Sequence, residues 1–247
     1  HRLLTELRKS RSDGENEWDR LCDSHAAMPH FIFEMTEETV NLRLTAISEK
    51  DKSKWVWTGR EWERSEESPR KNGNKPEVLD DPRLKPAIKW LRQLDWFTPE
   101  PGLWIGDANE HFLDTLAATW PGRPAEAQYL GNPMFHRLFL GGKRLKPKLL
   151  VKGSGIDWFT VSAEWEQEGL KLTRNDLKAL AASTNRFVKL PDSGWIELDA
   201  DAVLQAHETL AELGLDGLVP VAQKVELGQA AQLNETALNQ FGKNKAA

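Results

Sequence analysis

A strictly alternating run of residues constrains the fold of this chain more than any other feature. Between Trp158 and Glu166, every second residue is one that a protein core would bury: Phe159, Val161, Ala163 and Trp165. A period of two is the pattern of a β-strand with one buried face. A β-rich run over 146–152 precedes it, and Gly153-Ser154-Gly155 supplies turn chemistry between them. The two runs therefore predict a hairpin.

A helix, two short strands and a second helix are predicted after the hairpin. Thr173 opens the first helix, and Asp176 follows three residues later in a variant of the capping box. Short strands are expected over 186–190 and 195–198, joined by a Pro-Asp-Ser-Gly turn. Asp199 then caps the last helix, whose buried side recurs at helical spacing: Val203, Ala206, Leu210 and Leu213. This order of elements predicts a compact α+β unit.

Residues 130–230, approximately, resemble the helicase-associated domain that precedes the motor of bacterial Swi/Snf-type ATP-dependent DNA helicases and translocases. The features that carry the resemblance are the KPKLLVKGSGIDWFTVSAEW hairpin, the LTRNDLKAL helix, the RFVKL strand, Gly194-Trp195-Ile196 and the Leu-rich closing helix. The resemblance implies a non-catalytic accessory domain that positions nucleic acid or regulates the motor. The partners that it implies are the motor domain of the parent chain, and DNA or a nucleic-acid-processing protein.

The ATP-binding loop of such a motor is not found in this sequence. That loop needs GxxxxGK[ST], whose backbone N–H groups and lysine hold the nucleotide phosphates. The nearest stretch, Gly141-Gly142-Lys143-Arg144, has neither the spacing nor the Ser or Thr. Because the chain begins at His1 and shows no catalytic constellation, we expect a fragment that is not an enzyme and has no cofactor. ATP and Mg²⁺ would belong to the parent motor.

Composition is typical of a cytoplasmic globular protein. A single cysteine among 247 residues excludes an internal disulfide framework and fits a reducing compartment. No apolar run approaches the length of about 18 residues that is needed to cross a bilayer, so no membrane partner is expected. The formal net charge of −5 argues against a general nucleic-acid binder, because contacts with phosphates need clustered Lys and Arg.

The positive charge is nevertheless concentrated in one segment. Residues 127–156 contain no Asp or Glu, but they hold six basic residues: Arg137, Lys143, Arg144, Lys146, Lys148 and Lys152. This pattern predicts a face that contacts nucleic acid or the acidic surface of a partner. The alternative is an ordinary solvated strand face.

The N-terminal half predicts a second, separate α/β region. Alternating residues over 30–64 indicate a small antiparallel sheet, which includes a hairpin around Gly59. The remaining expectations are a mobile polar loop over 65–82, a helix over 83–98, a short strand at 103–105 and a helix over 108–120.

The predicted fold class is α+β, with small antiparallel sheets and packed helices in two subdomains. The first would span 1–124 and the second 125–247, with a linker toward the missing motor after about residue 214.

Two further patterns leave alternatives open. Three of the eleven tryptophans, Trp55, Trp57 and Trp62, flank Gly59. As an open row they would suit a stand-alone Trp-rich protein- or sugar-binding module, whereas buried indoles would be core residues. Cys22, His25 and His30, with Asp23 beside them, have side chains that zinc accepts. Only three good ligands occur and Pro29 interrupts the segment, so we predict no metal site there.

Overall fold

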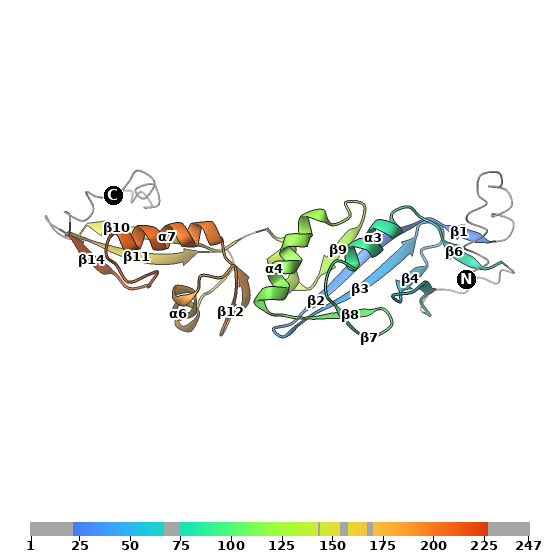
Figure 1. Cartoon of the computed structure of the whole chain (residues 1–247), viewed down its shortest axis with the longest axis horizontal. Helices are drawn as coiled ribbons and strands as arrows, with labels where there is room; N and C mark the ends of the chain where they lie inside the picture. Colours follow the sequence, from blue (N-terminus) through green and yellow to red (C-terminus); the bar gives the residue numbers. More distant parts are fainter. Residues whose placement is uncertain (1–21, 67–74, 143, 154–157, 167–169, 227–247) are drawn as a thin grey trace. The chain divides into compact units, whose positions relative to one another are not determined.

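The structure is a computed structural model that describes residues 22–66, 75–142, 144–153, 158–166 and 170–226 (Figure 1). Contacts divide the chain into two compact units. Among the described residues, the first unit holds 22–35, 39–66, 75–107 and 115–132, and the second holds 36–38, 108–114, 133–142, 144–153, 158–166 and 170–226. Both units combine helices with small, mainly antiparallel sheets, so the predicted α+β class is confirmed.

The first unit is built on a sheet of seven strands. Its centre is the antiparallel pair β2 (Ala27–Met35) and β3 (Thr39–Ser48). The other strands are β4 (Lys54–Trp57), β5 (Trp62–Arg64), β7 (Phe97–Glu100), β8 (Leu103–Asp107) and β9 (Gln128–Gly131). β3 pairs with β4 near one end and with β8 near the other, and β9 pairs with β2 in parallel.

The alternation in β2 and β3 places one face of this sheet in the core, as predicted. Phe31, Phe33 and Met35 on β2 are each at most 2% exposed. Helix α3 (Leu84–Leu91) packs on this strand, with the Trp90 indole edge-on to Phe31 at 5.0 Å. Tyr129 of β9 stacks on the Phe31 ring at 5.2 Å. These aromatic residues therefore fill the core of the first unit.

Two segments differ from the sequence prediction. α3 ends at Leu91 rather than at 98, and Phe97–Glu100 forms β7 instead. Pro99 disfavours the α conformation at Thr98, but it does not explain why the helix ends at Leu91. The expected loop over 65–82 contains a strand, β6 (Glu77–Leu79), which pairs in parallel with β1 (Asp23–His25). Residues 67–74 of that loop lie outside the described residues.

Helix α4 (Glu110–Thr119) confirms the predicted helix over 108–120, and the 3-10 turn η1 (Trp120–Gly122) follows it. α4 buries Phe112, Leu113 and Leu116. None of the helices within the described ranges combines the length and the apolar character that a membrane span needs.

The second unit contains the predicted hairpin and helices. β10 (Lys146–Gly153) and β11 (Trp158–Glu166) pair antiparallel, and β14 (Gln223–Glu226) adds to β11. β12 (Phe187–Leu190) and β13 (Gly194–Glu197) form a separate hairpin. α6 (Arg174–Ala182) precedes that hairpin and α7 (Ala200–Glu212) follows it. Before them come the short helix α5 (Pro133–Phe135) and the π-helical turn η2 (His136–Leu140).

One apolar core joins these elements. Val203, Ala206, Leu210 and Leu213 pack with Leu149, Val161 and Ala163. α7 therefore covers the inner face of the β10–β11 sheet, along which it lies in Figure 1. The capping box is also present: Thr173 Oγ1 accepts from the Asp176 N–H, and Asp176 accepts from the Thr173 N–H. Asp199 caps α7 by accepting from the Ala202 N–H at 3.1 Å.

The boundaries of the units differ from the expected ones. The first unit continues past residue 124, because β9 pairs with β2. The segment after 214, expected as a linker, contributes β14 to the second unit, and Leu218 and Val225 are fully buried there. Pairing between segments that are distant in sequence leaves no local signal, which is why both strands were missed.

Candidate functional site

Three of the six predicted basic residues lie on β10. Lys146, Lys148 and Lys152 alternate on the strand and are exposed, whereas Leu149 between them is 1% exposed in the core. The three lysines therefore project from the sheet face opposite α7. Lys143 lies outside the described residues.

Acidic residues of the same unit hold two of the predicted basic side chains. Arg144 Nε lies 2.9 Å from Glu197 Oε1, and Lys146 Nζ lies 3.0 Å from Asp199 Oδ2. Residues 127–156 contain no Asp or Glu, but acidic side chains from other segments lie beside them in the folded unit. These carboxylates come from β13 and from the cap of α7, so the linear pattern could not show them.

The Arg137 side chain is half-buried and bonded to the backbone. Its Nη2 donates to the carbonyl oxygens of Ser193 and Trp195, at 3.0 and 2.9 Å. Burial lowers the pKa of the Arg137 guanidinium from its usual value. Its hydrogen-bond partners belong to the β12–β13 hairpin. Arg137 therefore supports the backbone of that hairpin, whereas the β10 lysines are exposed to solvent.

The exposed sheet face gains a lysine that the sequence analysis did not identify. Thr160 of β11 pairs in register with Lys152 on one side and with Lys224 of β14 on the other. Lys224 Nζ lies 5.0 Å from the centre of the half-buried Trp158 ring. We name Lys148, Lys152 and Lys224 the lysine face. No ion pair of these three side chains occurs among the described residues, although the exposed Glu164 is paired in register with Lys148.

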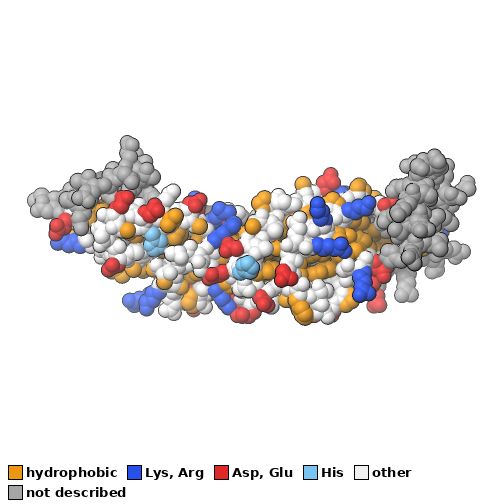
Figure 2. Space-filling view, in the orientation of Figure 1, with side chains coloured by type: hydrophobic (Ala, Val, Ile, Leu, Met, Phe, Trp, Pro, Cys, Tyr) orange, Lys and Arg blue, Asp and Glu red, His pale blue; other side chains and the backbone are white. Residues whose placement is uncertain are grey.

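Charge is mixed on the face of the molecule that Figure 2 draws. On the side of the molecule drawn in Figure 2, basic and acidic side chains both occur over each unit. A strongly basic surface of the kind that binds nucleic acid tightly is not visible there.

The row of indoles is not open to solvent as a binding module would need. Trp55 and Trp57 are 5% and 7% exposed, and Trp62 is half-buried. The binding-module hypothesis loses the support of an exposed row. The three indoles do border a pocket of about 620 Å³, whose lining also includes Glu77, Asp81 and Lys85.

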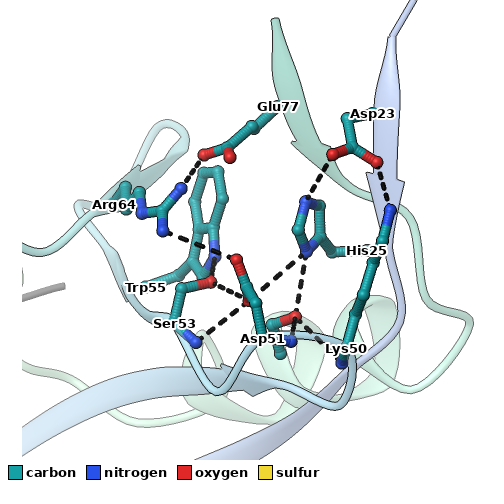
Figure 3. Close-up of polar contacts among 9 residues, drawn as sticks. Asp23, His25, Lys50, Asp51, Ser53, Trp55, Arg64 and Glu77 are labelled. Carbon is teal, nitrogen blue, oxygen red and sulfur yellow. Dashed lines mark hydrogen bonds and ion pairs between the residues drawn. The ribbon is translucent and has the colours of Figure 1, made fainter. Parts of the chain in front are cut away.

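A group of polar side chains lies where β1 pairs with β6. The parallel register places Asp23 opposite Glu77, and His25 follows Asp23 on the same face of β1. One potential ligand atom from each of the three residues lies within 4.8 Å of the others. Figure 3 shows the three side chains and their polar contacts. His25 is fully buried, whereas the Asp23 and Glu77 side chains are 29% and 20% exposed.

The other edge of the His25 ring is held by the loop after β3. Nδ1 lies 2.9 Å from Ser48 Oγ and 3.6 Å from Asp51 Oδ1. Asp51 accepts from Ser53 Oγ at 2.7 Å and from the Ser53 N–H at 3.1 Å. Desolvation raises the pKa of Asp51, but hydrogen bonds from Ser53 and Ser48 outweigh it and hold the pKa well below its usual value.

Two basic side chains complete the cluster. Lys50 Nζ lies 2.5 Å from Asp23 Oδ1, and Arg64 pairs with Glu77 and with Asp51. His25 Nε2 lies 3.6 Å from Asp23 Oδ2, which is beyond hydrogen-bonding distance, and it has no hydrogen-bond partner.

Two of the metal ligands considered from the sequence are not among the residues that gather around His25. Cys22 is buried and His30 is half-buried on β2, and neither belongs to the group of Asp23, His25 and Glu77. Glu77 was missed because it lies in the segment expected as a loop. Only the parallel pairing of β1 with β6 brings it to His25.

The chain was compared with family models, curated proteins and solved structures, and none of them matches it. The resemblance of residues 130–230 to the helicase-associated domain stays a prediction. The functional hypothesis depends on the residues that carry this resemblance and on the lysine face.

Proposed function

We propose that the chain is a non-catalytic accessory module of a bacterial Swi/Snf-type ATP-dependent DNA translocase, and that it contacts nucleic-acid phosphates through the lysine face. The observation that carries the contact is the outward alternation of lysines on β10, extended across β11 by Lys224. The motor context comes from the resemblance of residues 130–230. In this role the module guides nucleic acid for the motor and does not hydrolyse ATP.

The charges limit how strong this contact can be. Asp199 compensates Lys146, and Arg144 shares Glu197 with Arg186, so Arg144 and Lys146 attract phosphates less than unpaired side chains would. The three residues of the lysine face would contact about three phosphates. For double-stranded DNA, this corresponds to a slope of log K against log[salt] of about −2.7. Such binding is weak and depends on salt, which suits a module that adds to the grip of a motor.

Trp158 adds a second kind of contact. Its indole is half-buried on the same side of the sheet as Thr160, beside Lys224. Aromatic rings next to lysines on a sheet surface stack with the bases of single strands, at about 1–3 kcal/mol per base. We therefore expect single-stranded DNA to bind more tightly than its phosphate contacts alone would allow.

Neutralising the lysine face tests the proposal. The variant Lys148→Gln/Lys152→Gln/Lys224→Gln removes three positive charges from it. A matched control, Lys171→Gln/Arg174→Gln/Lys178→Gln, removes three exposed positive charges on and just before α6 of the same unit. Fluorescence anisotropy of labelled DNA should show loss of binding in the first variant only. Equal binding by both variants would show that the lysine face is not the contact.

A further inference from the structure

We propose that Asp23, His25 and Glu77 form a Zn²⁺ site in the first unit, at the pairing of β1 with β6 (Figure 3). The proposal is independent of the nucleic-acid contact, which belongs to the second unit. Nε2 of the fully buried His25 has no hydrogen-bond partner among the described residues. Buried polar atoms in folded proteins are almost always bonded, so such an atom needs an explanation.

The contacts on the far edge of the His25 ring allow a metal-binding tautomer. Ser48 Oγ lies 2.9 Å from His25 Nδ1, and it accepts from the backbone N–H groups of Lys50 and Asp51 at 3.3 and 3.4 Å. If the Ser48 hydroxyl donates to the Asp51 carboxylate, then His25 Nδ1–H donates to Ser48 Oγ. The lone pair of Nε2 then points toward the carboxylates of Asp23 and Glu77. A lone pair facing carboxylates is repulsive unless a cation lies between them.

The distances suit a zinc ion with one further ligand. Zn²⁺ binds imidazole nitrogen and carboxylate oxygen at about 2.0–2.2 Å, so neighbouring ligand atoms in a tetrahedron are about 3.4 Å apart. His25 Nε2 and Asp23 Oδ2 are 3.6 Å apart. The three ligand atoms lie within 4.8 Å of one another, so the widest pair would close by at most about 1.4 Å. Three protein ligands leave a fourth position for water.

The outer hydrogen bonds also fit a metal site. Histidines that bind metals usually donate their other ring N–H to a fixed oxygen, which sets the tautomer. Ser48 supplies that oxygen, and Ser48 is itself fully buried. The mixture of one imidazole and two carboxylates favours Zn²⁺ over Mg²⁺ or Ca²⁺, which prefer oxygen ligands alone.

The ion would stabilise an otherwise weak part of the fold. β1 and β6 form a two-stranded parallel sheet of three residues each, and such short pairs are marginal without further support. A metal bound to both strands links them directly. Glu77 also lines the pocket of about 620 Å³, so the ion would fix one wall of that pocket.

Zinc binding by the full 247-residue chain tests the proposal. The chain is first freed of metal with a chelator. The probe is Zn²⁺ alone, titrated in competition with a chromogenic chelator. We expect one ion per chain, and at least about a 100-fold weaker affinity in Asp23→Asn and in Glu77→Gln. Both side chains are partly exposed, so these variants should fold, in contrast to variants of the buried His25. Cys22→Ala and His30→Gln are the controls and should bind as the wild type does.

Two further readouts separate ligation from a merely structural role. Co²⁺ in place of Zn²⁺ should give ligand-field bands without a thiolate charge-transfer band, since Cys22 is not a ligand. Lys50→Gln should bind Zn²⁺ more tightly than the wild type, because Lys50 competes for Asp23 and repels the ion. Failure of the wild type to bind Zn²⁺ would overturn the proposal. Loss of binding in Cys22→Ala, or no loss in Glu77→Gln, would overturn it too.

Discussion

Replacing Asp176 should destabilise the second unit by an amount that depends on pH. The carboxylate has no exposed surface, and it accepts three hydrogen bonds, one of which belongs to the capping box. The donors are the Thr173 N–H at 3.1 Å, the Asp192 N–H at 3.0 Å and Ser193 Oγ at 2.7 Å. One side chain therefore ties the start of α6 to the turn between β12 and β13.

The expected cost of Asp176→Asn follows from these contacts. Hydrogen bonds to a charged acceptor contribute about 1.5–3 kcal/mol each, but contributions within one network do not add. Asparagine keeps one acceptor oxygen and the shape of the side chain, while its NH₂ group would face a donor. We expect a loss of about 2–3 kcal/mol in the free energy of unfolding. The control is Asp201→Asn, an exposed residue in the first turn of α7, which should cost less than about 1 kcal/mol.

The pH dependence has a definite sign. Desolvation raises the pKa of Asp176, but hydrogen bonds from Asp192, Ser193 and Thr173 outweigh it, so the folded-state pKa lies below its usual value. Stabilisation by the ionised carboxylate is thus complete above the unfolded-state pKa of about 3.9. It is lost as the pH falls through the folded-state pKa. The difference between wild type and Asp176→Asn should shrink as the pH is lowered from 7 toward 3.

Urea unfolding followed by circular dichroism measures the change, and peptide-resolved hydrogen exchange locates it. Amides over 173–193 should lose protection in Asp176→Asn and keep it in Asp201→Asn. If the two variants unfold at the same urea concentration, or if their difference is unchanged at pH 3, the role assigned to the Asp176 network is wrong.

Two other predictions concern packing. Gly102→Ala should destabilise the first unit by about 1–2 kcal/mol or more in thermal or urea unfolding, because φ is +82° and the added Cβ would meet Val56 at 2.9 Å. Gly122→Ala has no atom within 4 Å of its new Cβ and should unfold as the wild type does. If Gly102→Ala and Gly122→Ala destabilise the chain equally, the clash at Gly102 is not the cause. Leu149→Ala should cost about 2–5 kcal/mol in the free energy of unfolding, because it opens a cavity under α7. Leu204→Ala, at a site 59% exposed, should cost less than about 0.5 kcal/mol, and a similar cost at both sites would refute the core assignment.

Local sequence signals predicted much of the second unit. The alternation in β11 follows from its single buried face, and the caps at Thr173 and Asp199 follow from side chains that bond the nearest backbone N–H groups. Each of these signals lies within a few residues of the structure that it specifies. The same is true of the hairpin around Gly59, whose φ is +99°.

Pairings between distant segments could not be predicted in the same way. β1 pairs with β6 and β11 with β14 across many residues, and the short strands β1, β6 and β14 each resemble loop sequence when taken alone. Several residues of the two candidate sites could not be predicted for the same reason. Lys224 and Glu77 reach their places only through such pairings, and Glu197 and Asp199 lie beside Arg144 and Lys146 only in the folded unit.

The dependence of DNA binding on salt tests the central proposal most directly. Anisotropy of a labelled DNA duplex, titrated with the wild-type chain at several salt concentrations, gives log K against log[salt]. Three phosphate contacts predict a slope of about −2.7, and the Lys148→Gln/Lys152→Gln/Lys224→Gln variant should show a slope near zero or no binding. If the wild type shows no binding at low salt, or if the variant keeps the wild-type slope, the lysine face does not contact nucleic acid.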